Sequence, residues 1–164
     1  MAEQTINWNK VNPVISSSLE IIQTTYPNQV GAFLDWYEQQ AGSTRSIYDP
    51  VMVQWVIDGI PRVRSIITAL NKEIDTRLAR VTRTATGPGT VQTKIEATKR
   101  DRDTIKGLRE LIVDFLGCRN QLGEWFVGLL DLLAARFPQK AVFRNTIPDF
   151  QNICLVNRQA LLSL

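Results

Sequence analysis

Four cationic residues stand at helical spacing in the second half of the chain. Lys99, Arg102, Lys106 and Arg109 are separated by three, four and three residues, which places their side chains along one edge of a single helix. Like charges at this spacing destabilise an isolated helix by roughly 0.2–0.5 kcal/mol per pair. The row therefore favours binding of a polyanion, and the alternative interpretation is a solvated surface balanced by neighbouring carboxylates.

The positive charge of the chain is concentrated in its middle. The 164 residues have a net charge of +3, but residues 61–119 contain 13 Lys and Arg against 7 Asp and Glu, while the remainder contains 6 against 9. This asymmetry indicates contact with nucleic acid or another anionic surface through the middle segment. Trp55 is the only aromatic residue between Asp49 and Asp114, so we expect contact with the phosphate backbone and not base stacking.

The sequence has no pattern typical of a catalytic or metal site. Histidine is absent, and Cys118 and Cys154 are 36 residues apart without a CxxC motif, which excludes zinc sites and Cys–His nucleophiles. The glycine-rich segment 87–90 lacks the spacing and the lysine of a P-loop. We therefore expect no enzyme, no cofactor and no metal. Because no signal peptide is recognisable at the start, we expect an intracellular protein with both thiols reduced.

Helix signals dominate the chain, and strand alternation is nearly absent. We predict one all-α domain over residues 1–164. The expected helices cover residues 12–24, 30–40, 50 to about 59, 61–83, 91–117, 122–137 and 149–162. A break is expected at Gly59-Ile60-Pro61, and a loop at Thr84–Thr90. Two long central helices are therefore expected as antiparallel neighbours.

The longest apolar stretch, residues 125–135, is shorter than the ~20 residues that a membrane span needs. We predict that it forms a buried helix and that the protein has no membrane partner. The tryptophans are expected to pack in the core, although Trp36, Trp125 and Phe126 are also candidates for contacts between subunits.

Short motifs in the basic region resemble a known family. Asp75-Thr76-Arg77, then Glu96-Ala97-Thr98-Lys99-Arg100, and then Asp103 and Arg109 resemble the central segment of the coat proteins of rod-shaped, tobacco-mosaic-like plant viruses. The resemblance extends to Leu111-Ile112-Val113-Asp114 and covers about 40 residues. Ala79 replaces the family's second arginine, and Arg80 follows it.

The resemblance implies an antiparallel four-helix bundle, with additional short helices at both ends of this chain, that polymerises into a helical rod and binds single-stranded RNA. By this resemblance Arg77 and Arg100 would bind phosphate, Asp103 would face a ribose hydroxyl, and Arg109 would lie against phosphate or base. With the helix-face argument, the expected RNA-contact region is about 72–110, and the expected RNA-binding residues are Arg77, Arg80, Lys99, Arg100, Arg102, Asp103, Lys106 and Arg109.

The expected function is that of a capsid protein that polymerises around genomic single-stranded RNA, in the virion and in the host cell cytoplasm. Many weak phosphate contacts would then add up to strong binding. The alternatives are a small nucleic-acid-binding helical regulator and a helical adaptor whose basic stripe meets an acidic protein or membrane surface. Exposed apolar side chains on outer helices would favour the polymer over the regulator.

Overall fold

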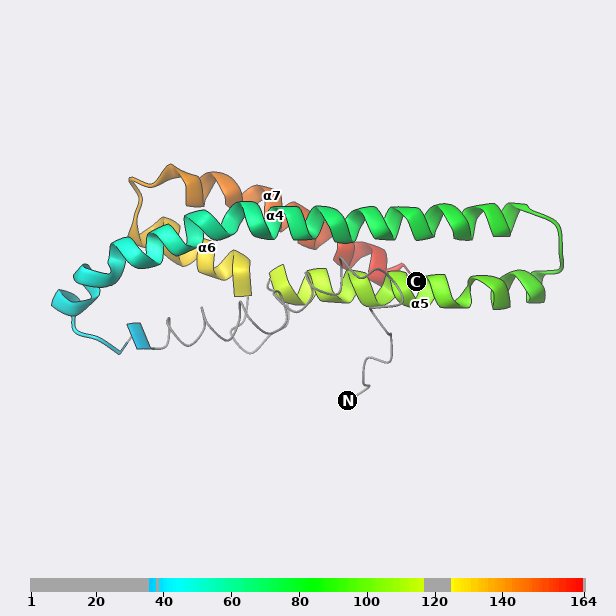
Figure 1. Ribbon diagram of the computed structural model, residues 1–164, viewed down its shortest axis with the longest axis horizontal. Helices are drawn as coiled ribbons and strands as arrows, with labels where there is room; N and C mark the ends of the chain where they lie inside the picture. Colours follow the sequence, from blue (N-terminus) through cyan, green and yellow to red (C-terminus); the bar gives the residue numbers. More distant parts are fainter. Residues whose placement is uncertain (1–35, 38, 117–124, 164) are drawn as a thin grey trace.

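The computed structural model describes residues 36, 37, 39–116 and 125–163, and these residues contain helices and turns without a strand. The helices are α4 (Gly42–Thr86), α5 (Val91–Leu116), α6 (Trp125–Arg136) and α7 (Ala141–Leu162). The all-α class is confirmed, and the four helices pack against one another (Figure 1). The expected helix 12–24 and most of the helix 30–40 lie outside the described residues.

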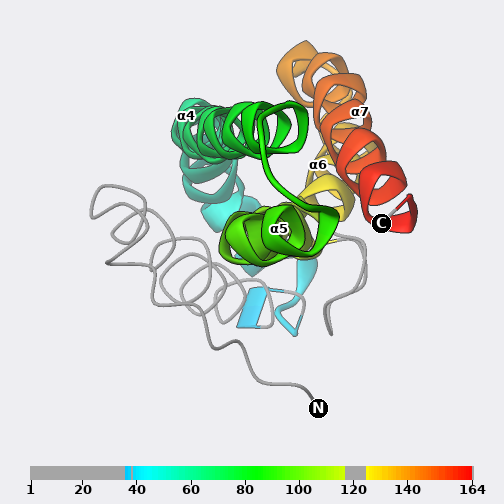
Figure 2. The same cartoon turned by 90° about the vertical axis from the view of Figure 1, so that its right-hand side faces the viewer.

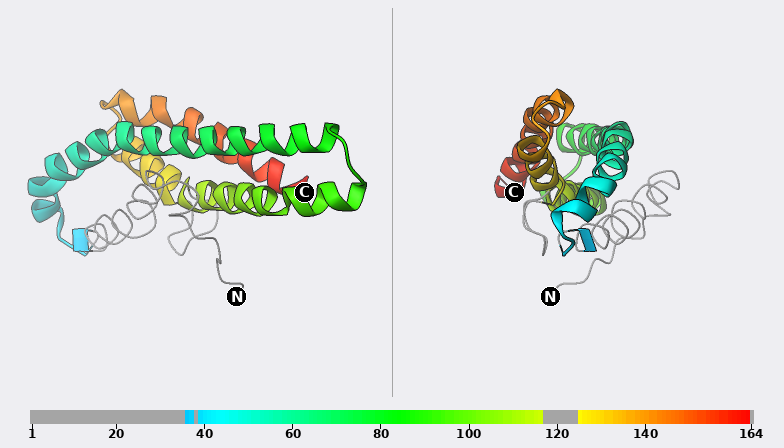
Figure 3. Two further views of the ribbon diagram at one scale, coloured as in Figure 1. Left: turned by 45° about the vertical axis from the view of Figure 1, so that its right-hand side comes forward. Right: turned by 90° about the vertical axis from the view of Figure 1, so that its left-hand side faces the viewer.

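Helices α4 and α5 form the long arm of the molecule and run antiparallel, as expected (Figure 1). Helix α6 continues in the direction of α5, and α7 returns across the α5 and α6 side of the bundle. Figure 2, viewed along the long axis, shows α7 beside the α4–α5 pair. Figure 3 shows α7 running obliquely to that pair. Helix α7 is therefore a full member of the bundle, and it begins earlier than the short terminal helix expected over residues 149–162.

The predicted break at Gly59-Ile60-Pro61 is wrong, because α4 is one continuous helix of 45 residues with Pro50 and Pro61 inside it. Proline in a helix interior costs about 3 kcal/mol. Burial on both sides of Pro61 offsets this cost, since the apolar stripe keeps its helical phase through the proline. The buried members of that stripe are Val56, Ile60, Val63, Ile67, Leu70 and Ile74.

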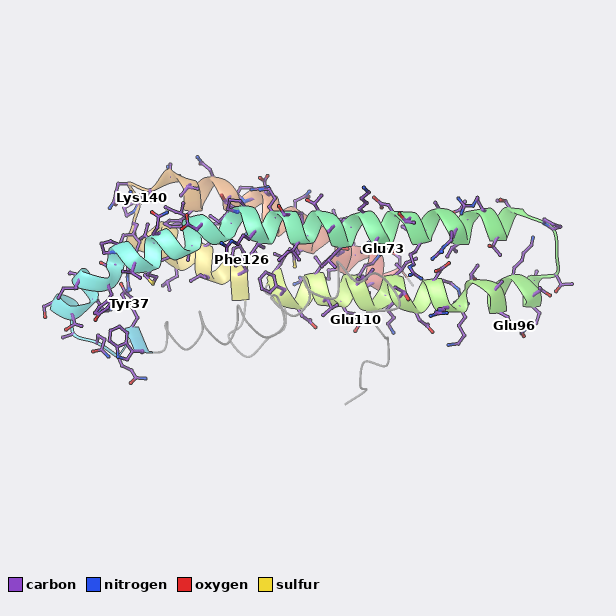
Figure 4. All side chains as sticks on the ribbon, viewed as in Figure 1. Tyr37, Glu73, Glu96, Glu110, Phe126 and Lys140 are labelled. Carbon is purple, nitrogen blue, oxygen red and sulfur yellow. The ribbon has the colours of Figure 1, made fainter. Side chains whose placement is uncertain are left out.

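A core of buried apolar side chains joins the four helices. Leu70 of α4 and Leu108 of α5 are fully buried, and Phe126 of α6 stacks on Phe115 with ring centroids 5.6 Å apart. The rings of Phe126 and Phe150 of α7 pack edge-to-face with centroids 5.4 Å apart, and Figure 4 labels Phe126. The expectation that Phe126 contributes to contacts between subunits is therefore wrong. Trp36 is 39% exposed, while the side chain of Trp125 lies outside the described part of the structure.

Candidate nucleic-acid interface

A tight turn at the tip of the long arm aligns the basic ends of α4 and α5. The turn is Gly87–Thr90, shorter than the predicted loop, because α4 continues to Thr86. The Thr90 hydroxyl accepts a hydrogen bond from the Thr93 amide, as an N-cap residue does. The Lys94 ammonium donates to the Ala85 carbonyl at 3.1 Å, which satisfies one of the last carbonyls of α4. Residues 77–84 are thereby placed opposite residues 97–101.

Arg77 takes the next inward position of the α4 stripe after Ile74, and it is buried there. Its side chain is 9% exposed, its Nε donates to Glu73 Oε2 at 3.0 Å, and one terminal nitrogen donates to Asp101 Oδ1 at 2.7 Å. Asp101 occupies the matching position on α5, one turn before Ile105. Figure 4 labels Glu73 on the arm formed by α4 and α5. An ion pair therefore continues the interface between these helices beyond the apolar core.

Asp101 also accepts a second arginine. A terminal nitrogen of Arg80 donates to the same Asp101 oxygen at 2.8 Å, and the Arg80 side chain is 46% exposed. One carboxylate oxygen thus binds two guanidinium groups from successive turns of α4. Because Arg80 is largely solvated, its ion pair contributes little to stability, on the order of 0–1 kcal/mol.

These residues line a cleft of about 480 Å³ between the two helices, and its lining consists of Arg77, Arg80, Arg83, Thr84, Ala97, Arg100 and Asp101. Arg83 and Arg100 are exposed, and neither has a hydrogen bond or ion pair with any described residue. The lining contains four cations and one carboxylate. An arginine-lined cleft of this kind can bind the oxygens of a phosphate group through charge-assisted hydrogen bonds.

The cleft brings together three of the eight expected RNA-binding residues, namely Arg77, Arg80 and Arg100. Arg77 and Arg100 come from the two separate motifs that carry the family resemblance, and they meet here across the helix pair. Lys99 and Arg102 lie on another side of α5, because successive residues of a helix are rotated by about 100°. The single predicted site is therefore divided over two faces of α5.

The first half of the basic row makes local contacts. Lys99 pairs with Asp103 at 2.9 Å, and both side chains are largely exposed. Arg102 donates from Nε to the Thr98 hydroxyl at 3.1 Å and from a terminal nitrogen to the Ile95 carbonyl at 2.8 Å. These contacts do not test RNA binding, so the RNA-binding role of Lys99, Arg102 and Asp103 stays a prediction.

The second half of the row approaches α7. Arg109 donates to the Asn157 side-chain oxygen at 3.2 Å, and Asn157 is buried. Burial lowers the pKa of Arg109, while the nearby Asp75 carboxylate acts in the opposite direction. Lys106 is exposed and forms no ion pair within the described ranges. Arg109 therefore links α5 to α7. To contact RNA as expected, Arg109 would have to bind it while keeping the hydrogen bond to Asn157.

Arg83, Thr84 and Asp101 line the cleft but were absent from the expected site. The sequence contained a signal for Arg83, since Arg77, Arg80 and Arg83 repeat at intervals of three residues. The loop was expected to begin at Thr84, directly after Arg83. The contribution of Asp101 depends on the packing of α5 against α4, which spacing along the chain does not specify.

No group of three or more His, Cys, Asp or Glu residues that could bind a metal occurs in the part of the chain that the structure describes. Cys154 is buried and disulfide-bonded, so the expectation of two reduced thiols is wrong at this residue. The one other cysteine, Cys118, lies outside the described residues. Among the helices described, none has an apolar stretch long enough to cross a lipid bilayer.

Large apolar side chains are exposed on all four described helices. Leu155 and Val156 on α7 are 48% and 51% exposed, and Val91 near the turn is 74% exposed. The others are Ile47, Tyr48, Val51, Leu78, Ile95, Leu132, Val142 and Leu162. Single exposed apolar residues are common on monomeric proteins, but a distribution over several outer surfaces is suited to repeated contacts between copies.

Comparisons of the chain with protein-family models, with curated proteins and with solved structures give no match.

Proposed function

We propose that this chain is a structural coat protein that polymerises around single-stranded RNA in a helical virion and in the cytoplasm of the host cell. The observation that carries the proposal is the arginine-lined cleft between α4 and α5. Its lining contains no aromatic residue, which favours contact with the sugar–phosphate backbone independent of base identity. A coat protein must bind every part of its genome and needs this kind of contact.

The resemblance to rod-shaped virus coat proteins supports the same function. Arg77 and Arg100, which are 23 positions apart, were expected at the RNA from two separate motifs, and both line the cleft. Each subunit would neutralise few phosphates, and polymerisation would turn these weak contacts into strong total binding.

The exposed apolar residues favour a polymer over a monomeric nucleic-acid-binding regulator. Contacts repeated head-to-tail between copies give rings or open helices, and exposed side chains such as Leu155 and Val156 supply apolar area for them. A monomeric regulator, or an adaptor for acidic surfaces, would not need these apolar side chains for contacts between copies.

Sedimentation of the full chain with and without single-stranded RNA, followed by nuclease digestion, tests the proposal. We expect RNA to convert the protein into large particles that protect the RNA from nuclease. A particle of constant small size whose RNA is digested would contradict the coat-protein function and favour the regulator. Retention of an acidic protein or anionic vesicles, without retention of RNA, would favour the adaptor.

A further inference from the structure

We infer that Arg83 joins Arg100 as a phosphate ligand of the cleft, and that Asp101 is a positioning residue that withholds Arg77 and Arg80 from phosphate. This inference rests on the proposed function and deepens it, because it names the ligand group and divides the cationic lining into two roles. Arg83 and Asp101 belong to neither family motif, so the division follows from the contacts alone.

Arg77 is the least available cation of the cleft. Its side chain is 9% exposed and donates to two carboxylates, Glu73 and Asp101, which are 14% and 17% exposed. A phosphate that bound Arg77 would displace a carboxylate from a site with little water, and the displaced carboxylate would lose a charge-assisted hydrogen bond. Arg77 therefore forms the floor of the cleft.

Arg80 is intermediate in its availability to phosphate. Its guanidinium donates to the same oxygen of Asp101 that Arg77 uses, so one carboxylate orients both groups. The charge of Asp101 also opposes an anion that approaches Arg80. Loss of this carboxylate charge would make Arg80 available to phosphate without removing any cation from the cleft.

Arg83 and Arg100 are the available cations, one on each helix. Both are exposed and line the cleft, and neither has a partner among the residues described. Thr84 belongs to the same lining, and its hydroxyl is a further hydrogen-bond donor. A volume of about 480 Å³ falls in the size range of pockets that bind small organic ligands, roughly 300–1,000 Å³. The guanidinium groups of Arg83 and Arg100 and the Thr84 hydroxyl are suited to the oxygens of one phosphodiester unit of a single strand.

The test measures the salt dependence of binding of single-stranded oligouridylate, by fluorescence anisotropy at a protein concentration below that of assembly. Arg83→Gln and Arg100→Gln should each make the slope of log K against log salt shallower by about 0.7, the value for one lost phosphate contact on a single strand. Arg62→Gln is the matched control, since Arg62 is exposed on the same helix, 21 residues before Arg83. The control slope should equal that of the unmodified protein.

Asp101→Asn separates positioning from direct binding. It should make the slope steeper by about 0.7, because Arg80 becomes available to phosphate. Circular dichroism confirms that each variant is folded, and the exposed Arg83 and Arg100 variants decide the ligand assignment even if Asp101→Asn does not fold. An unchanged slope for Arg83→Gln, or a shallower slope for a folded Asp101→Asn, would overturn the inference.

Inorganic tripolyphosphate separates this inference from the proposed function. Calorimetric binding of tripolyphosphate that Arg83→Gln and Arg100→Gln both weaken at least threefold supports the cleft assignment, even if no RNA-containing particle ever forms. Conversely, both variants could form RNA-containing particles normally and show unchanged tripolyphosphate binding. This result would agree with the coat-protein function but would show that Arg83 is not a phosphate ligand.

Discussion

Replacement of Arg77 by methionine should destabilise the helix bundle, because Arg77 lies between two carboxylates at the interface of α4 and α5. Its side chain is 9% exposed, and its partners Glu73 and Asp101 are 14% and 17% exposed. Removal of one partner from a buried ion pair costs about 3–5 kcal/mol. Asp101 keeps its contact with Arg80 in this variant, so we expect a loss at the lower end of this range. The shorter of the two contacts, at 2.7 Å, joins the two helices, so the loss acts on tertiary packing.

We expect the free energy of unfolding to fall by about 3 kcal/mol in Arg77→Met. For a chain of this size, this loss corresponds to a decrease of roughly 6–12 °C in Tm. Urea denaturation and thermal melting, followed by circular dichroism at a concentration that keeps the protein monomeric, measure the two quantities. Arg62→Met is the control, because the exposed Arg62 should change stability by less than about 0.5 kcal/mol.

A triple variant tests the physical reason. When Glu73→Gln and Asp101→Asn are combined with Arg77→Met, no buried carboxylate remains that has lost its contact with Arg77, and most of the lost stability should return. A loss below about 1 kcal/mol for Arg77→Met alone, or no recovery in the triple variant, would contradict a stabilising buried ion pair at Arg77. Arg77 would then be a solvated cation available to RNA.

Four further substitutions test the burial of Tyr37, the turn at Gly89, the core around Phe126 and the exposed surface of α7. Burial, followed by the hydrogen bond to Asp49, raises the pKa of Tyr37. The stability that protonated Tyr37 contributes is complete below the unfolded pKa of about 10 and is lost as pH rises through the folded pKa. The stability advantage over Tyr37→Phe should therefore shrink between pH 8 and pH 11, and a constant difference in urea denaturation would argue against the raised pKa. Gly89 has φ +121°, so Gly89→Ala should lower the free energy of unfolding by at least about 1 kcal/mol in urea denaturation. The control Gly42→Ala should not destabilise the protein, and equal effects of the two substitutions would contradict the turn geometry. Phe126→Ala should cost about 3–5 kcal/mol by thermal melting, and a loss below 1 kcal/mol would mean that Phe126 is not in the core. Leu155→Ser should leave subunit stability within about 0.5 kcal/mol but reduce particle size in sedimentation, and full-length particles would exclude this part of α7 from subunit contacts.

Local sequence signals predicted the parts of the fold that depend on neighbouring residues. The end of α6 before Pro138 and the range of α5, expected over 91–117 and found at Val91–Leu116, follow from helix breakers and apolar periodicity. The break expected at Pro61 does not occur, because burial of Ile60 and Val63 on either side keeps α4 helical. That burial comes from contacts with other helices, which a local signal does not contain.

The candidate site was predictable to a similar degree. Arg77, Arg80 and Arg100 were identified from motifs and spacing, and the structure places them around one cleft. Asp101 acts there only because α4 and α5 face each other in one particular register. The contact of Arg109 with Asn157 joins residues 48 positions apart, and such pairs depend on packing that helical spacing alone does not predict.

Electron microscopy of particles assembled from the purified chain and single-stranded RNAs of different lengths is the decisive measurement for the proposed coat-protein function. If the chain is a coat protein that binds RNA along its length, the particles are helical, and their length increases in proportion to the length of the RNA. Particles whose size does not depend on RNA length, or protein that stays in small units with every RNA, would contradict a coat-protein function.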